Sequence, residues 1–231
     1  MTRRGYIAWI ALALGASFAI AGCTEFFPPY PTPAKPSTTI SGSAAGSVSV
    51  TGAAAIAVYA TKAGGDPAGD VLVYARPLDK GAASVPNTQP AVLDILDRHF
   101  EPAILPVRAG DSVTIQNLDD VPHDIYSFSS TRPLSLHLAA GEQHAALSFT
   151  HPGVVTVGCK IYNEMQGYIY VTDAPYFGKT DSHGFLRLTG LPPGRYKLGA
   201  WRAGSSDSDL AGYPRTLTLK PGTEQVVRVR L

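Results

Sequence analysis

Short runs in which apolar and polar residues alternate recur along most of this chain. Between Ser112 and Gln116, for example, Val113 and Ile115 occupy every second position. A period of two residues places side chains alternately on the two faces of a β-strand. Turns containing glycine and proline separate the runs, and the 231 residues include 23 Gly and 19 Pro. These features predict an all-β fold.

The sequence places the strands between these turn signals. Residues 71–74 are continuously apolar and are expected to be buried on both faces. Residues 91–100 fit one face of a helix as well, but two prolines bracket them closely, so a strand is favoured. A glycine at 158 is expected to end one strand, and residues 159–166 are expected to form a loop. The other predicted strands are 47–50, 55–60, 112–117, 134–138, 146–150, 154–157, 167–171, 185–188, 196–201, 216–220 and 227–231.

The first residues indicate export. Arg3 and Arg4 precede an apolar run, residues 7–20, that is too short to span a bilayer comfortably. The sequence Ile-Ala-Gly-Cys that ends at Cys23 then resembles the lipobox of bacterial lipoproteins. The resemblance implies that residues 1–22 are a signal peptide and that Cys23 becomes lipidated. An ordinary signal peptide or membrane anchor is the alternative, and the general secretory and twin-arginine routes both stay open.

A lipidated Cys23 has consequences for compartment and for the second cysteine. The chain would be anchored on the periplasmic side of a bacterial membrane, the outer membrane in preference to the inner one. Residues 23–47 are rich in Pro, Ser, Gly and Ala and are expected to form a tether. Cys159 then has no intramolecular partner for a disulfide, so it is expected to be buried or bound to metal. The formal net charge of +1 and the lack of a basic stripe argue against a nucleic-acid partner.

Three residues of types that bind copper occur in this order between the predicted strands: His123, Cys159 and Met165. His123 lies in a polar stretch after one predicted strand, and Cys159 and Met165 lie close together between two later strands. Copper that changes oxidation state is usually held by two imidazoles, a thiolate and a weak axial thioether. Taken singly, Cys159 and Met165 would more often be core residues, but their combination with His123 indicates copper-site geometry.

The surrounding sequence resembles the cupredoxins, and in particular the plastocyanin-like methylamine utilisation proteins. The resemblance rests on Phe-Glu-Pro at 100–102, Gly-Asp-Ser-Val at 110–113, Asn-Leu-Asp at 117–119, His-Asp-Ile-Tyr-Ser-Phe-Ser at 123–129, Pro-Gly at 152–153, Gly-Cys at 158–159, and Met-Gln-Gly-Tyr-Ile-Tyr-Val at 165–171. It implies a Greek-key β-sandwich over residues 91–173. It also implies that His123 is the upstream imidazole ligand, Cys159 the thiolate and Met165 the axial thioether.

One position departs from the family pattern. The second histidine is expected three residues after the cysteine, where this chain has Tyr162. An unperturbed phenol has a pKa near 10 and is a harder ligand than imidazole. Three outcomes are open: a Cu(I) site without a second imidazole, an altered Cu(II) site that uses Tyr162, Glu164 or a borrowed histidine, or an empty cupredoxin shell.

The remaining candidates have weaker signals. Asp124 is expected either to orient the His123 imidazole from outside the ligand set or to be an ordinary loop residue. The other five histidines are expected on solvated strands or turns: His99, His137, His144, His151 and His183. The sequence has no nucleophile elbow, phosphate loop or notable carboxylate pair, so an enzyme is not expected.

The two flanks of the copper-type segment show a second resemblance. Asp-Ser-His-Gly-Phe at 181–185 and Leu-Pro-Pro-Gly-Arg-Tyr at 191–196 resemble carboxypeptidase-regulatory-like (transthyretin-like) sandwiches, and Gly-Asp-Pro at 65–67 before 71–73 echoes their first half. Residues 48–90 and 174–231 are therefore expected to form one small sandwich that the 91–173 unit interrupts.

Together these observations predict an extracytoplasmic, lipid-anchored protein, and the resemblance to the cupredoxins implies that it binds copper and transfers single electrons to an unidentified redox partner. A binding or structural module with a degenerate copper site, or a protein that only holds Cu(I), is the alternative.

Overall fold

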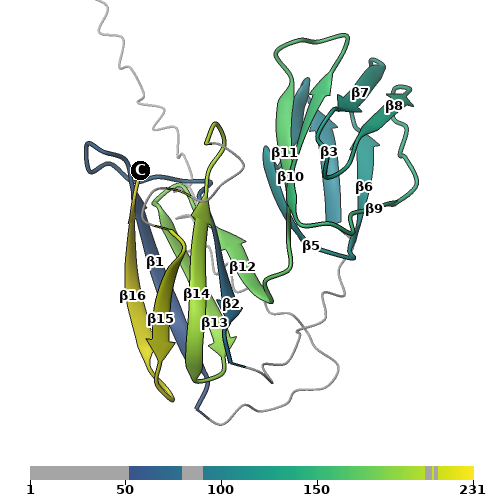
Figure 1. Cartoon of the computed structure of the whole chain (residues 1–231). Helices are drawn as coiled ribbons and strands as arrows, with labels where there is room; N and C mark the ends of the chain where they lie inside the picture. The colour runs from purple at the N-terminus through teal and green to yellow at the C-terminus, as the bar shows by residue number, and fades with distance from the viewer. Residues whose placement is uncertain (1–51, 80–90, 206–209, 211–212) are drawn as a thin grey trace, which may run out of the picture. The chain divides into compact units, whose positions relative to one another are not determined.

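The computed structural model describes residues 52–79, 91–205, 210 and 213–231. Every regular element in these parts of the chain is a β-strand, which confirms the all-β prediction (Figure 1). No helix in the described ranges has the length and hydropathy needed to cross a membrane. The residues of the predicted signal peptide, the predicted lipidation site Cys23, the predicted tether and the predicted strand at 47–50 lie outside the described residues.

Strands from the two flanks of the chain share two sheets. One sheet has the order β13-β1-β16 and the other has the order β12-β2-β14-β15. Their strands are β1 (Ala54–Thr61), β2 (Leu72–Pro77), β12 (Tyr176–Lys179), β13 (Phe185–Leu191), β14 (Gly194–Trp201), β15 (Arg215–Leu219) and β16 (Glu224–Arg230).

The pairings in these two sheets join the beginning of the described chain to its end. β1 runs parallel to β16, with Val58 opposite Val227. β2 pairs antiparallel with β14 on one side and with β12 on the other, where Ala75 lies opposite Tyr176. The chain therefore leaves this sandwich after β2 and re-enters it at the neighbouring strand β12.

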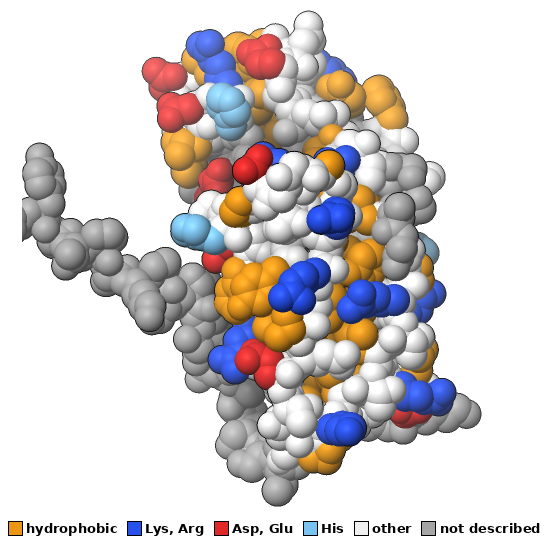
Figure 2. All heavy atoms as spheres, turned by 90° about the vertical axis from the view of Figure 1, so that its left-hand side faces the viewer, with side chains coloured by type: hydrophobic (Ala, Val, Ile, Leu, Met, Phe, Trp, Pro, Cys, Tyr) orange, Lys and Arg blue, Asp and Glu red, His pale blue; other side chains and the backbone are white. Residues whose placement is uncertain are grey.

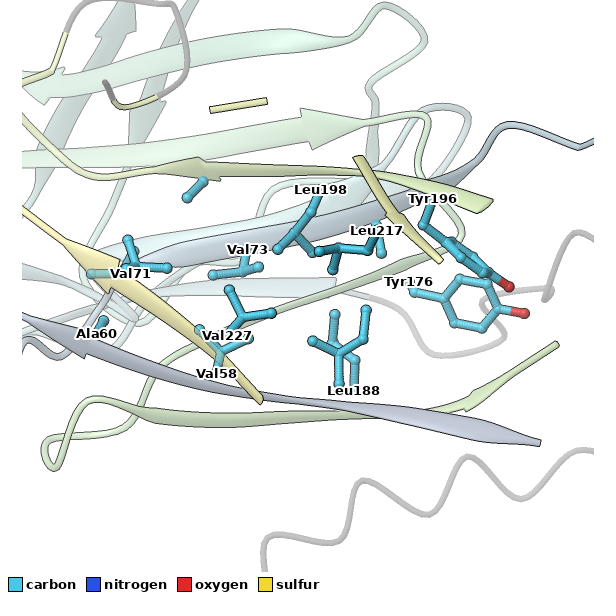
Figure 3. Close-up of a cluster of buried hydrophobic side chains, with 14 of the residues drawn as sticks. Val58, Ala60, Val71, Val73, Tyr176, Leu188, Tyr196, Leu198, Leu217 and Val227 are labelled. Atoms are coloured by element: carbon cyan, nitrogen blue, oxygen red, sulfur yellow. The ribbon is translucent and has the colours of Figure 1, made fainter. Parts of the chain in front are cut away.

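The side chains between these sheets are apolar and form one core. In Figure 3, side chains of β1, β13 and β16 point toward those of β2 and β14. Val58, Val73 and Leu198 are fully buried there. Burying an aliphatic side chain of this size stabilises a fold by about 1.5–3 kcal/mol. Alternate residues of β1 and β16 supply this face, as a period of two requires.

The unit between β2 and β12 contains the other two sheets. One has the order β5-β11-β10-β7-β8 and the other has the order β4-β3-β6-β9. Their strands are β3 (Ala91–Leu96), β4 (His99–Glu101), β5 (Ile104–Arg108), β6 (Ser112–Asn117), β7 (His123–Ser127), β8 (Leu134–Leu138), β9 (Leu147–Ser148), β10 (Gly153–Cys159) and β11 (Gln166–Thr172).

The buried side chains of this inserted unit also form one contiguous cluster. Unlike the core of the flanking sandwich, it includes sulfur-containing side chains. Ile115, Ile125 and Ile169 are fully buried in it. The same cluster contains Cys159 and Met165, which are 2% and 3% exposed. Two residues predicted as copper ligands are thus part of a hydrophobic core.

The observed strands differ from the predicted ones at residues 91–100 and at the end of β10, and both differences affect the site. Residues 91–100 form β3 and the start of β4, joined by a turn at Asp97 and Arg98, which both have positive φ. The strand expected to stop at Gly158 continues through Cys159, because these two residues pair with Tyr126 and Ile125 of β7. Cys159 is therefore the last residue of a strand, and the loop begins after it.

A third, smaller hydrophobic cluster combines residues of both sandwiches. Leu72 and Trp201 of the flanking strands are buried in it together with Ile104 and Val154 of the inserted unit.

On the outer surface, the face in Figure 2 shows Lys, Arg, Asp and Glu side chains interspersed with hydrophobic ones.

Candidate metal centre

His123 is the first residue of β7 and is completely buried. The strand alternates, with His123, Ile125 and Ser127 facing inward and the two residues between them half-buried. This alternation directs the imidazole into the core of the inserted unit, although the histidine follows a polar stretch of sequence. β6 ends at Asn117 as predicted, but the polar stretch after it was expected to include His123, which instead begins β7.

Cys159 lies beside His123 because their strands are neighbours in one sheet. Cys159 is paired with Ile125 across the β7–β10 ladder, and its Sγ lies 3.7 Å from Nδ1 of His123. Both side chains are buried, and Cys159 is a free cysteine. Two predicted donor atoms, 36 residues apart in sequence, are thus in contact.

Met165 returns the chain to the core after the loop that follows Cys159. Its backbone N–H donates to the carbonyl oxygen of Tyr162 at 3.1 Å, which closes a tight turn. β11 begins at the next residue, so the paired strands β10 and β11 hold both ends of this loop. Met165 and Cys159 belong to the same buried cluster.

Tyr162 occupies the position where the family pattern has a second histidine. Its half-buried ring packs against the core cluster, and its centroid lies 5.1 Å from that of the His123 ring, at an interplanar angle of 54°. The guanidinium carbon of Arg98 lies 4.8 Å from the centroid of the Tyr162 ring, which is a cation–π contact. Tyr162 therefore fills its place with an aromatic ring that touches the imidazole and is covered by a cation.

The carboxylate that holds the other nitrogen of His123 belongs to Asp119. Nε2 of His123 lies 2.9 Å from Oδ2 of Asp119, whose side chain is 8% exposed. The same carboxylate accepts hydrogen bonds from the backbone N–H groups of Asp97 at 2.6 Å and Arg98 at 3.0 Å. Burial raises the pKa of Asp119, but the bonds from Arg98, His123 and Asp97 outweigh it, so the pKa lies below its usual 3.8.

Asp124, expected either to orient His123 or to be an ordinary loop residue, lies in β7 and faces away from the His123 side chain. Its carboxylate bonds Nδ1 of His137 at 2.7 Å on the exposed side of the sheet. The reason is geometric, since adjacent residues of a strand point to opposite faces and His123 faces the core. Sequence reasoning included Asp119 in the match at 117–119 but gave it no role, although its position four residues before His123 in a polar stretch was the available signal.

Asn117 is a second buried polar residue that sequence reasoning did not single out. It is fully buried, and its amide donates to the carbonyl oxygens of Val121 and Ala139, both at 2.8 Å. Its Oδ1 accepts the N–H of Asp119 at 3.0 Å. Asn117 thus fixes the chain between β6 and β7, which carries Asp119 toward His123.

The other candidate ligands lie away from this core. Glu164 is exposed, as are four of the five remaining histidines, while His144 is half-buried. In the described parts of the chain, no group of three or more His, Cys, Asp or Glu side chains is arranged to hold a metal ion. Within the described residues, none of these five histidines therefore forms such a group with His123 and Cys159.

The donor types at the centre fit copper in its reduced state. A thiol, an imidazole nitrogen and a thioether are available, and soft sulfur ligands favour Cu(I). His123, Cys159 and Met165 would be the residues that hold the ion. Their nearly complete burial removes water from the site, which also favours the lower charge of Cu(I) over Cu(II).

No family model matches the chain, and no curated protein matches it. Among solved structures, it is similar to a purple cupredoxin from Nitrosopumilus maritimus, with 24% identity over 36% of this chain and 99% of that one and a TM-score of 0.32. An oxidized amicyanin mutant is 26% identical over 43% of this chain and 99% of its own, with a TM-score of 0.34.

A Cu-containing nitrite reductase from Thermus scotoductus is 25% identical over 42% of this chain, with a TM-score of 0.35. The similarity covers 25% of the reductase chain. TM-scores of this size carry no argument about function, so the assignment of the site depends on its own contacts.

Proposed function

We propose that the inserted unit is a cupredoxin-like domain that binds one copper ion through His123, Cys159 and Met165 and carries single electrons. The observation that supports this most directly is the 3.7 Å approach of Cys159 Sγ to His123 Nδ1 inside a closed core. Bound copper would supply a one-electron redox couple. The residues would hold it in a rigid, water-free place, since all three lie on or beside paired strands.

Exposed apolar residues adjacent in sequence to residues of the site support a redox protein as the partner. Leu96, Leu118 and Ile161 are each 46% exposed. Leu118 N–H donates to the carbonyl of Ile95 at 2.8 Å, which joins the first two, and Ile161 precedes Tyr162 in the ligand loop. Exposed apolar groups in one region are typical of docking surfaces. A partner that docks here would come close to the buried ligands without displacing them.

Copper loading of the full chain in detergent tests the proposal. The wild type is expected to bind one equivalent of Cu(I), and Cys159→Ser is expected to lose most of that affinity. His137→Ala is the control, because this histidine is exposed and bonded to Asp124. A wild type that binds no stoichiometric copper, or binding that Cys159→Ser leaves intact, contradicts the proposal.

A Cu(I)-holding protein without redox turnover is the second candidate, and the contact between Tyr162 and His123 favours it. The tyrosine ring fills the place of an imidazole that would keep Cu(II) accessible. A reversible midpoint potential of the loaded protein supports the electron carrier; copper bound only as Cu(I) supports the holding protein. Tyr162→His is expected to create a strong thiolate-to-copper visible band after Cu(II) is added.

We propose further that the protein is a carrier and no enzyme, anchored by lipid at Cys23 on the periplasmic side of a bacterial membrane. The sandwich formed by the flanks would be a transthyretin-like module that supports the copper domain. The sequence around Cys23 supports the anchor. Mass spectrometry of the mature N-terminus is expected to find an acylated Cys23, and an N-terminus without acyl groups contradicts it.

A further inference from the structure

Asp119 connects the candidate ligand His123 to a turn that belongs to the opposite sheet. The turn consists of Asp97 and Arg98, between β3 and β4, with φ values of 51° and 59°. Residues other than glycine adopt this left-handed region only at a cost in free energy, so such a turn requires support from outside. The Asp119 carboxylate gives this support, since it accepts the backbone N–H groups of both turn residues.

The same carboxylate determines which imidazole nitrogen of His123 carries the proton. A carboxylate only accepts hydrogen bonds, so at 2.9 Å from Asp119 the Nε2 atom is the donor. In the neutral ring, Nδ1 is then free of a proton and faces Sγ of Cys159. This is the nitrogen that would coordinate an ion held between the two side chains.

The turn also reaches the site from its other side. Arg98 extends from the turn and covers the ring of Tyr162, which in turn contacts the ring of His123. The contacts therefore form a closed ring: Asp119 bonds the turn, Arg98 of the turn contacts Tyr162, Tyr162 contacts His123, and His123 bonds Asp119. A disturbance at one member is expected to reach the others.

We propose that Asp119 is a positioning residue that couples the orientation of the His123 imidazole to the order of the Asp97–Arg98 turn. The turn and the imidazole share one buried acceptor, so the site keeps the ring orientation that copper needs only while the turn is formed. Of the proposed ligands, Asp119 bonds His123, and it acts through that residue.

The copper-free protein tests this coupling without reference to copper. Long-range ¹H–¹⁵N spectra of the wild type at neutral pH are expected to show His123 mainly as the Nε2–H tautomer, and a predominant Nδ1–H tautomer overturns the proposal. Asp119→Ala is expected to mix the tautomers and to speed hydrogen exchange at the amides of residues 97 and 98 by about tenfold or more.

Two further variants separate coupling from a general loss of structure. Asp120→Asn is the matched control, because this neighbour is exposed, and it is expected to leave tautomer and exchange unchanged. Asp119→Asn keeps the size of the side chain and is expected to change tautomer and exchange in the same direction as Asp119→Ala, but less. This variant provides the test if the alanine variant unfolds. Exchange at the turn that stays unchanged while the tautomer changes overturns the coupling.

The final measurement rests on the proposed copper site. Loss of a partner that orients a metal-bound histidine typically lowers metal affinity by about 10–100-fold. Asp119→Ala is therefore expected to bind Cu(I) about 10–100-fold more weakly than the wild type, with Asp120→Asn unchanged. Absence of copper binding in the wild type refutes the copper function alone, whereas unchanged affinity in Asp119→Ala refutes the positioning role.

Discussion

The two sandwiches of this protein differ in the partners of the polar groups buried in their cores. In the flanking sandwich, the hydroxyl of Thr180 accepts the N–H of Val71 and donates to the carbonyl of Ala68. In the inserted unit, the buried His123 bonds a carboxylate through one nitrogen and turns the other toward a thiol. A buried polar group that the backbone satisfies maintains a fold. One that faces a second reactive side chain marks a place for a ligand.

The largest expected effect comes from the apolar core of the flanking sandwich. Leu198 is fully buried there, so Leu198→Ala is expected to lower the free energy of unfolding by about 2–5 kcal/mol, through lost burial and a cavity. Denaturant titration measures this change. Leu78→Ala is the control, because Leu78 is 44% exposed. A loss below about 1 kcal/mol would contradict the view that this sandwich depends on its apolar packing.

Asn117 carries the next effect, in the inserted unit. Asn117→Ala would remove the amide donor from the carbonyl groups of Val121 and Ala139, the second of which keeps the N–H of Glu142, at a cost of about 1–3 kcal/mol in unfolding free energy. Thermal and denaturant unfolding measure it, with the exposed Asn163→Ala as control. The His123 resonances are expected to shift as well. If they stay unchanged, Asn117 supports the fold alone and the contrast between the two cores is weaker.

Tyr196 tests the flanking sandwich through pH. Its hydroxyl donates to the carbonyl of Pro192 at 2.7 Å, so Tyr196→Phe is expected to cost about 1 kcal/mol at neutral pH. Burial, with smaller effects of Tyr176 and Asp79, raises the pKa of Tyr196 from 10.0 to about 12. The folded state favours the neutral phenol, so stability present below pH 10 is lost as pH rises toward 12.

Unfolding followed against pH separates Tyr196→Phe from the wild type. The variant is expected to lose stability less steeply between pH 10 and 12, and part of the slope remains because burial also raises the pKa of Tyr176 and Tyr213. Equal alkaline slopes in the two proteins would mean that Tyr196 ionises as easily in the folded state as in the unfolded one.

The smallest effect is expected on the solvent side of the inserted unit. Asp124→Asn weakens a hydrogen-bonded pair with His137 whose side chains are 41% and 66% exposed, so the unfolding free energy is expected to change by at most about 0.5 kcal/mol. Copper affinity is expected to stay the same. An effect on copper as large as that of Asp119→Ala would restore Asp124 to the role that its sequence position first indicated.

Local sequence pattern predicted much of the fold because strand periodicity is a local property. Residues 71–74 are buried, as predicted. In β6, buried residues alternate with half-buried ones, which is the pattern expected of a strand with one face in the core. The turn at Asp97 and Arg98 was not predicted, since its support comes from Asp119, more than twenty residues later. The end of β10 was misjudged for the same reason, because its pairing with β7 lies outside any local window.

The candidate site, like the fold, could be predicted only in part from the sequence. Residue types and order, read with the family resemblance, selected His123 and Cys159, which the structure brings together. Asp124 was considered as a partner of His123 because it is adjacent in sequence, whereas the residue that bonds His123 in the structure is Asp119. The direction in which a side chain points depends on the strand that contains it, and the start of β7 at His123 was not evident from the sequence.

The pairing of β2 with β12 means that the inserted unit can be treated as an exchangeable cassette. Ala75 and Tyr176 face each other across an antiparallel ladder, so the two cut points are neighbours. A short turn between these strands would replace the whole unit with a hairpin connection. Such a deletion would leave the seven flanking strands with their partners, and the vacant junction would accept another domain whose ends lie equally close together.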